Sequence, residues 1–293
     1  MDSSPRSRHF IKTITLLGAT LLTWAVAQPS ADKAQNGIFA LAGAPARTSA
    51  RLSVNSSNAR TAANRITLQF YPLHGGQAIA QFDRERTKFV HFIVVRDDFR
   101  EYLHLHPERQ SSSFITSVAL AQNHRYYAYA DVSPHGIGQQ VFRFTLQGNA
   151  PDRRLQVLLS PSARQAMAGP YTVILSQTRP RAHQPLALSA AILRYGRPAK
   201  DIRPYLGAAA HVVIIDTSSL NYLHVHPESP RGATAMHGTN MTAMQDQDLP
   251  SSATVSPELT LHVSPLQRNA YKLFLEFRGG NTVYTAPFTL IAR

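Results

Sequence analysis

Two matching sets of three histidines are the residues of this chain best suited to chemistry. Each set has one histidine in an apolar run and a pair in an HxHPE motif, and corresponding histidines are 120 residues apart. The sets are His91, His104 and His106, and His211, His224 and His226. Neutral imidazole binds copper, zinc, nickel and iron well, so three imidazoles close together predict a transition-metal site.

The segments around these histidines reveal an internal repeat. The runs FVHFIVV and YLHLHPE return as AAHVVII and YLHVHPE. A later FTL triplet returns with the larger offset of 144 residues, so the second copy carries extra residues after its HVHPE motif. We expect a first repeat over about residues 34–148 and a second over about 152–293, with an insertion at about 229–256.

Hairpin geometry predicts that the three histidines of each set share one face of a sheet. A loop centred on residues 97–98 would place His91 directly opposite His104. His106 lies two residues further along the strand and points the same way. A turn centred on residues 217–218 does the same for the second set, so we expect two separate, similar sites. The alternative is that the histidines only brace the hairpins, through nearby carboxylates and backbone carbonyls.

Two acidic residues occupy equivalent places in the repeats, Asp131 after Tyr126 and Glu276 after Tyr271. Carboxylates commonly hold the outer nitrogen of a metal-binding histidine, and we expect these two to orient ligands. Four further histidines lie near turns or strand ends. We expect turn, structural or surface roles for them: His74, His124, His135 and His262.

The insertion in the second copy contains the sequence MHGTNMTAM, which brings together Met236, His237, Met241 and Met244. Thioether sulfur is a soft ligand that favours Cu(I) or Ag(I). Methionine also fills gaps in cores, but the polar neighbours of this loop leave little core to fill. We therefore expect a soft-metal role for the loop, with chance methionines in a flexible insert as the alternative.

The rest of the chain is typical of an all-β protein. Short β-branched or aromatic runs are bounded by Gly, Pro, Asn or Ser, and a single helical turn is conceivable at Ser162–Ala168. The runs cover residues 66–70, 126–130, 141–146, 171–175, 186–193 and 271–277. We expect two tandem antiparallel β-sandwich repeats, immunoglobulin-like or cupredoxin-like.

The amino terminus has the pattern of a secretory signal peptide over residues 1–27. Basic residues precede a short apolar run, and Ala25-Val26-Ala27 supplies the small residues of a cleavage site. The apolar run is shorter than the roughly 20 residues of a membrane span, so we expect no stable membrane insertion. Residues 28–50 read as a flexible leader running into the first repeat. The expected location is the periplasm or the medium.

Composition narrows the function further. The chain has a formal charge of +13, 43% hydrophobic residues and no cysteine, so metal ligands must be His, Met or carboxylate. Export and scattered arginines argue against nucleic acid as a partner. The sequence lacks a GxSxG elbow, a phosphate-binding glycine loop, an HExxH helix and any thiol nucleophile, so we expect no enzymatic activity.

The His91 and RDD segment with HLHPE, and PYLGA leading to His211 and HVHPE, resemble a family of bacterial secreted or periplasmic HxHP-repeat proteins associated with heavy-metal, chiefly copper, handling. The resemblance covers most of the chain from about residue 64 onward. It implies β-sandwich repeats without catalytic activity. Its HxHP pairs correspond to His104 with His106 and to His224 with His226.

Together these features predict an exported protein that binds or delivers copper or silver in the cell envelope. The expected cofactor is a copper ion, Cu(I) or Cu(II), with zinc as the alternative. The expected partners are metal ions and a metal-efflux or envelope protein. The competing hypothesis is a structural or adhesive envelope module without metal. The sequence leaves the oligomeric state open.

Overall fold

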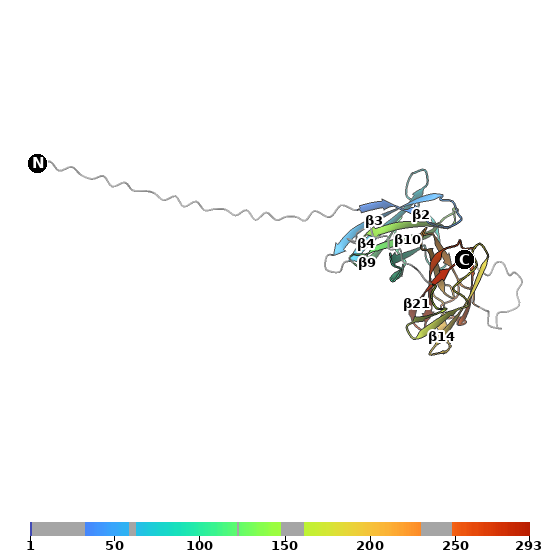
Figure 1. The fold of residues 1–293 in the computed structure, drawn as a ribbon. Helices are drawn as coiled ribbons and strands as arrows, with labels where there is room; N and C mark the ends of the chain where they lie inside the picture. Colours follow the sequence, from blue (N-terminus) through green and yellow to red (C-terminus); the bar gives the residue numbers. More distant parts are fainter. Residues whose placement is uncertain (2–32, 59–62, 122, 148–160, 230–247) are drawn as a thin grey trace. The chain divides into compact units, whose positions relative to one another are not determined.

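The fold is given by a computed structural model, which describes Met1 and residues 33–58, 63–121, 123–147, 161–229 and 248–293. Within these residues every regular element is a β-strand and all strand pairs are antiparallel, which confirms the predicted all-β class (Figure 1). Residues from Asp32 to Arg293 form one compact unit. No helix capable of crossing a membrane occurs among the described residues.

The first repeat contains two sheets. The order of the first is β1 (Lys33–Asn36), β3 (Thr48–Asn58), β4 (Ala63–Pro72), β9 (Ser113–Ala119) and β8 (Glu108–Gln110). The order of the second is β2 (Ile38–Phe39), β11 (Gln140–Gln147), β10 (Arg125–Pro134), β6 (Val90–Arg96) and β7 (Tyr102–Leu105), with β5 (Phe82–Asp83) also paired to β10. Apolar side chains from both sheets form one core, among them Leu68, Phe70, Phe92 and Phe142.

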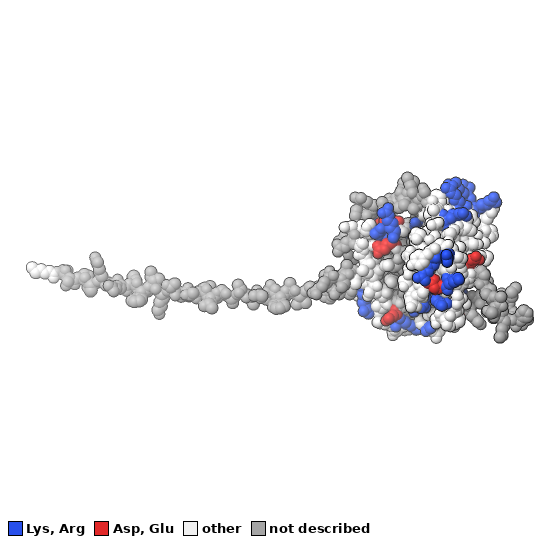
Figure 2. Space-filling model, turned by 90° about the horizontal axis from the view of Figure 1, so that it is seen from below, with Lys and Arg blue, Asp and Glu red and all other residues white. Residues whose placement is uncertain are grey.

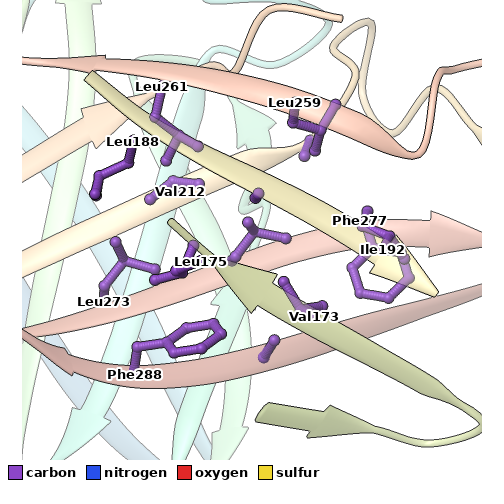
Figure 3. Close-up of a cluster of buried hydrophobic side chains, with 14 of the residues drawn as sticks. Val173, Leu175, Leu188, Ile192, Val212, Leu259, Leu261, Leu273, Phe277 and Phe288 are labelled. Atoms are coloured by element: carbon purple, nitrogen blue, oxygen red, sulfur yellow. The ribbon is translucent and has the colours of Figure 1, made fainter. Parts of the chain in front are cut away.

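The second repeat also contains two sheets. One has β12 (Gln165–Ala168), β13 (Tyr171–Leu175), β14 (Leu186–Arg194) and β15 (Arg197–Pro198), with β19 (Glu258–Val263) paired to β14. The other has β16 (Ile202–Arg203), β20 (Ala270–Gly279), β17 (His211–Asp216) and β18 (Tyr222–Val225), with β21 (Thr282–Ile291) paired to β20. Figure 3 shows the core between them, where Val173 and Ile192 belong to one sheet and Val212, Leu273 and Phe288 to the other.

Burial patterns separate ordinary strands from β6 and β17, which carry His91 and His211. β14 alternates between buried and more exposed residues, as a strand with one face on a core should. In β6 and β17 nearly every residue is buried. Alternate side chains of β6 face the sandwich core, and the others, Ile93 and Val95, pack in a third cluster with Val213 and Ile215 of the second repeat. The two repeats therefore share a buried apolar contact.

Further contacts between the repeats surround that third cluster. The Tyr222 amide donates to the carbonyl of Ala40 at 2.9 Å, and the Tyr129 hydroxyl donates to the carbonyl of Leu220 at 3.2 Å. The rings of Tyr129 and Tyr222 stack with centroids 5.2 Å apart. Each of the strands β6 and β17 thus turns one apolar face toward the other repeat, and that face also bears a histidine.

The predicted hairpin register was wrong by two residues. His104 pairs with Ile93, not His91, and in the second repeat His224 pairs with Val213. The loops are four residues long and end one residue later than expected, with Phe99 and Leu220 in the left-handed conformation. A shift of two residues preserves the alternation of faces, so the histidines still lie on one side of each sheet.

Other local predictions had mixed outcomes. All six predicted runs lie within strands: β4, β10, β11, β13, β14 and β20. The helical turn at Ser162–Ala168 was wrong, because residues 165–168 pair with β13 as strand β12. The flexible leader was wrong from Lys33 onward, because β1 and β2 find partners in β3 and β11. The signal-peptide segment and the MHGTNMTAM loop lie outside the described residues.

The surface agrees with a scattered arrangement of positive charge. On the face drawn in Figure 2, Lys and Arg form several separate groups with Asp and Glu among them. No continuous basic stripe is visible on that face of the described residues.

Candidate metal centre

The two histidine sets meet in a single cluster between the repeats. The ring centroids of His91 and His224 are 4.9 Å apart, and His211 lies 5.6 Å from both His91 and His104. The two sets of histidines are therefore adjacent in space, and each lies within contact distance of the other. Sequence spacing placed each triad within its own hairpin, but it carried no information on how the two hairpin faces pack against each other.

The three ring nitrogens of the first triad, and those of His211 and His224 in the second, converge at distances suited to sharing an ion. In the first triad, His104 Nε2 is 2.9 Å from His91 Nδ1 and 3.2 Å from His106 Nε2. In the second, His211 Nδ1 is 3.1 Å from His224 Nε2, and the His226 ring centroid lies 4.6 Å from that of His224. Two imidazoles bound tetrahedrally at 2.0–2.1 Å from one metal would have nitrogens about 3.3 Å apart.

Backbone carbonyls fix the tautomers of the two strand histidines. The outer nitrogen of His91, Nε2, is 3.2 Å from the carbonyl of Glu85, and that of His211 is 3.0 Å from the carbonyl of Tyr205. A carbonyl can only accept, so each Nε2 carries the hydrogen and donates it. A neutral ring then has its lone pair on Nδ1, the atom that faces the rest of the triad.

Carboxylates hold the next histidines, and each carboxylate comes from the other repeat. His104 Nδ1 lies 2.5 Å from Glu276 Oε2, and His224 Nδ1 lies 3.1 Å from Asp131 Oδ2. All four side chains are buried, with exposures from 0% to 6%. Burial raises the pKa of Asp131. In its ionised form each carboxylate accepts the hydrogen of the outer nitrogen, which leaves a lone pair on the inner Nε2 atom. The exchange between repeats was not predicted, although the two acidic residues were.

The inner nitrogens consequently face one another without enough hydrogens to share. His91 Nδ1 and His104 Nε2 both present lone pairs at 2.9 Å, and the matching pair in the second repeat does so at 3.1 Å. Within the described residues, His226 Nε2 is buried and has no hydrogen-bond partner. Buried polar atoms are normally satisfied, and a cation between the rings is one group that could satisfy these nitrogens.

Burial keeps the imidazoles neutral. Desolvation, and then repulsion from neighbouring histidines, lowers the pKa of His106 to about 2 and that of His224 to about 3. Desolvation and the charges of His224 and Arg86 lower the pKa of His226 to about 2. The pKa values of His91 and His211 are also well below the usual range, with burial as the main cause. Neutral imidazole is the form that binds metal, so these rings are ready to do so at neutral pH.

Two residues near the centre were missed from sequence. Glu85 can hold a metal ion together with His224 and His226, and its Oε1 lies 3.9 Å from His226 Nδ1. Burial, followed by the charge of Asp131, raises the pKa of Glu85 to about 8. Tyr102 donates from its hydroxyl to Glu276 Oε2 at 3.1 Å. The signal for Glu85 was its place six residues before His91, where the second repeat has Tyr205 before His211.

The other predicted residues lie away from the triads. His135 is largely exposed and pairs with Asp83 at 2.7 Å, and His124 lies 3.8 Å from Asp97. His262 lines a pocket of about 280 Å³ together with Gln139 and His224. That pocket gives solvent a way toward the second triad. Met236, His237, Met241 and Met244 lie outside the described residues.

The described residues contain three overlapping groups that could hold a metal ion. They are His91 with His104 and His106, His91 with His211 and His224, and Glu85 with His224 and His226. The overlap follows from the short distances between the triads.

Comparison with known proteins adds one match. Residues 165–293 match a domain of unknown function, DUF8832. The match includes the second triad and Glu276 but not the first triad or Asp131. No curated protein matches the chain.

Proposed function

We propose that this protein binds transition-metal ions, with copper as the physiological metal, at the histidine centre between its repeats. The observation that carries the proposal is the convergence of three ring nitrogens, His91 Nδ1, His104 Nε2 and His106 Nε2. One proton can link only two of these nitrogens, whereas one metal ion can accept all three lone pairs. In the second repeat His211 Nδ1 and His224 Nε2 approach to 3.1 Å, and His226 groups with His224 and Glu85.

The donor set favours copper over the alternatives. Neutral nitrogen ligands bind divalent first-row metals most tightly at Cu(II), and imidazole also binds Cu(I). Zinc remains the competitor, since three histidines also suit it. The Met236, Met241 and Met244 thioethers would add a soft ligand set for Cu(I) or Ag(I). Export, and delivery to a metal-efflux or envelope protein, complete the proposal and rest on the sequence alone.

Metal titration of the purified full chain tests this function. Cu(I) under anaerobic conditions, Cu(II) and Zn(II) are each added in competition with a chromophoric chelator, and bound metal is measured after desalting. Replacing His104, His106, His224 and His226 by Ala should abolish tight Cu(II) binding, and deletion of residues 236–244 in the same variant should also abolish tight Cu(I) binding. The matched control is His135→Ala, which removes an exposed histidine that also contacts a carboxylate. Cu(II) binding that survives the fourfold variant, or Cu(I) binding that survives the added deletion, would overturn the proposal.

The competing function is a metal-free structural module. The observation that favours it is the complete set of partners on the outer nitrogens of His91, His104, His211 and His224. Such a network could brace the repeat interface without an ion. It would predict a purified protein that takes up none of the three metals at micromolar concentration and whose unfolding temperature does not respond to them.

A further inference from the structure

We propose that the six histidines form one paired centre that takes two copper ions, and that each ion's ligands are oriented by a carboxylate from the opposite repeat. Glu276 is thus the positioning residue for the first triad, and Asp131 for the second. This inference rests on the proposed metal-binding function. It adds the number of ions, their proximity and the crossed dependence of the two halves.

Distances argue for two ions instead of one. A single ion held by six nitrogens at 2.0–2.1 Å needs every pair of nitrogens within about 4.2 Å. Within the described residues, the sets whose ligand atoms lie within 4.8 Å of one another contain three residues each. One ion can therefore not be held by all six rings as they stand. The first triad is one such set, and His224 and His226 form another with Glu85, so two ions can be held at the same time.

The triads are also too close to act as unrelated sites. His91 belongs both to the first triad and to a group with His211 and His224. Its ring centroid is 5.3 Å from that of His106 and 4.9 Å from that of His224, in the other repeat. Two ions held by the triads would therefore be near neighbours.

Charge makes such a pair possible in a buried place. Two like charges close together need compensating negative charge, because burial of unbalanced charge is costly. Glu276 and Asp131 are both buried and lie directly behind His104 and His224. Two carboxylates can balance two single positive charges, which favours a pair of Cu(I) ions.

Each carboxylate contacts a histidine of the other repeat, and this crossed arrangement can be tested by mutation. Glu276 pairs in register with His211, yet its carboxylate contacts His104 of the other repeat. Asp131 pairs in register with His91, yet its carboxylate contacts His224. Outer carboxylates of this kind typically change metal affinity by 10- to 100-fold when they are replaced. Each carboxylate should therefore act mainly on the ion in the repeat to which it does not belong.

The first experiment measures this crossed effect by Cu(I) competition titration in the full chain. With the second triad disabled by His224→Ala and His226→Ala, Glu276→Gln should lower the Cu(I) affinity of the first triad by about tenfold or more. Asp131→Asn in the same background should change it by less than about threefold. With His104→Ala and His106→Ala, the two carboxylate variants should exchange their effects. Dependence of each ion on its own repeat's carboxylate, or equal dependence on both, would overturn the proposal.

Controls separate positioning from folding. Asp83→Asn removes an exposed carboxylate that contacts His135 and should leave both ions unchanged. Asp131→Glu keeps a carboxylate and should recover part of the affinity lost in Asp131→Asn. The unfolding temperature of each metal-free variant shows whether it has kept its fold. The second experiment keeps all six histidines and both carboxylates.

The second experiment counts and locates the ions in the unaltered protein. Native mass spectrometry with Cu(I) should give two ions per chain that remain bound when residues 236–244 are deleted, and electron paramagnetic resonance after Cu(II) loading should show magnetic coupling between two ions. One ion per chain, or two without coupling, would contradict the paired centre while leaving metal binding intact. Absence of any bound copper would instead remove the proposed function itself.

Discussion

The two halves of the centre share a backbone plan but differ in the side chains around it. Glu85 and Tyr205 are equivalent: each gives its carbonyl to a strand histidine at nearly the same distance. Their side chains diverge, because Glu85 brings a carboxyl group near His226, whereas Tyr205 packs its ring against His211. The halves therefore present the same imidazoles in different surroundings.

The outer carboxylates show a similar contrast. Glu276 accepts a hydrogen bond from the Tyr102 hydroxyl, and Asp131 accepts two from the Gln139 amide at 2.9 and 3.1 Å. Gln139 also lines the pocket that reaches His224. The two copies thus share the backbone hydrogen bond to the strand histidine but differ in the polar side chains that contact each carboxylate. We expect two ions with related geometry and unequal affinity.

The largest expected effect is acid unfolding of the metal-free protein. Burial lowers the pKa values of His106, His224 and His226 to between about 2 and 3 in the folded state. The unfolded chain takes up these protons near pH 6.5, so stability is present above that pH and is lost as pH falls toward 3. Between pH 6.5 and its folded-state pKa, each of these histidines lowers the free energy of unfolding by about 1.4 kcal/mol for every unit that the pH falls. Circular dichroism should show unfolding by about pH 5.

Two matched variants, one in each repeat, test whether His106 and His226 contribute equally to acid unfolding. His106→Leu and His226→Leu should each lower the unfolding midpoint on the pH scale, and by similar amounts, because both rings have similarly lowered pKa values. Bound copper should also lower that midpoint, since protons must displace the ion. A midpoint that does not move in either variant would contradict the role of these neutral rings.

A single aromatic truncation at the repeat interface should have the next largest effect. Tyr222 is fully buried and stacks on Tyr129, so Tyr222→Ala should lower the free energy of unfolding by about 3–5 kcal/mol. Denaturant titration measures the loss. Val283→Ala, at an exposed position, should change stability by less than about 0.5 kcal/mol. A Tyr222→Ala effect as small as this control would mean that the interface contributes little.

Replacing Glu85 should sharpen the difference between the halves. Burial raises the pKa of Glu85 to about 8, so folding opposes its ionisation, and stability falls as pH rises from about 4.5 to 8. Glu85→Gln should stabilise the metal-free protein at pH 8 by on the order of 2 kcal/mol and leave it nearly unchanged at pH 4. Thermal unfolding at both pH values checks this. Tyr205→Phe is the control at the equivalent place and should show no such pH dependence.

The smallest expected effect concerns the hydrogen bonds to the two carboxylates. Tyr102→Phe removes the bond to Glu276 and Gln139→Ala removes those to Asp131. Bonds to charged groups contribute about 1.5–3 kcal/mol, only part of which should reach the metal. Copper affinity should fall several-fold, for the first triad in Tyr102→Phe and for the second in Gln139→Ala. Competition titration of the single-triad backgrounds separates the two.

The sequence predicted what depends on local alternation. Strand positions, the all-β class and the common face of each triad follow from side-chain alternation, which survived an error of two residues in register. The centre of each four-residue loop was predicted one residue too early, because Phe99 and Leu220 adopt a left-handed conformation that is uncommon for such side chains. The meeting of the triads, the crossing of Asp131 and Glu276, and the role of Glu85 depend on packing between distant segments. Spacing within one hairpin cannot supply that information.

The buried second face of β6 and β17 bears on how such a protein could have arisen. A lone repeat would expose Ile93, Val95 and its histidines to water, and its outer carboxylate would have no imidazole to hold. A second copy of the same repeat, related by twofold symmetry, could supply both the apolar partner and the missing carboxylate. Gene duplication would then join in one chain what began as a symmetric dimer. In a fused chain the two copies can change independently, and Glu85 and Tyr205 are different residues at equivalent positions.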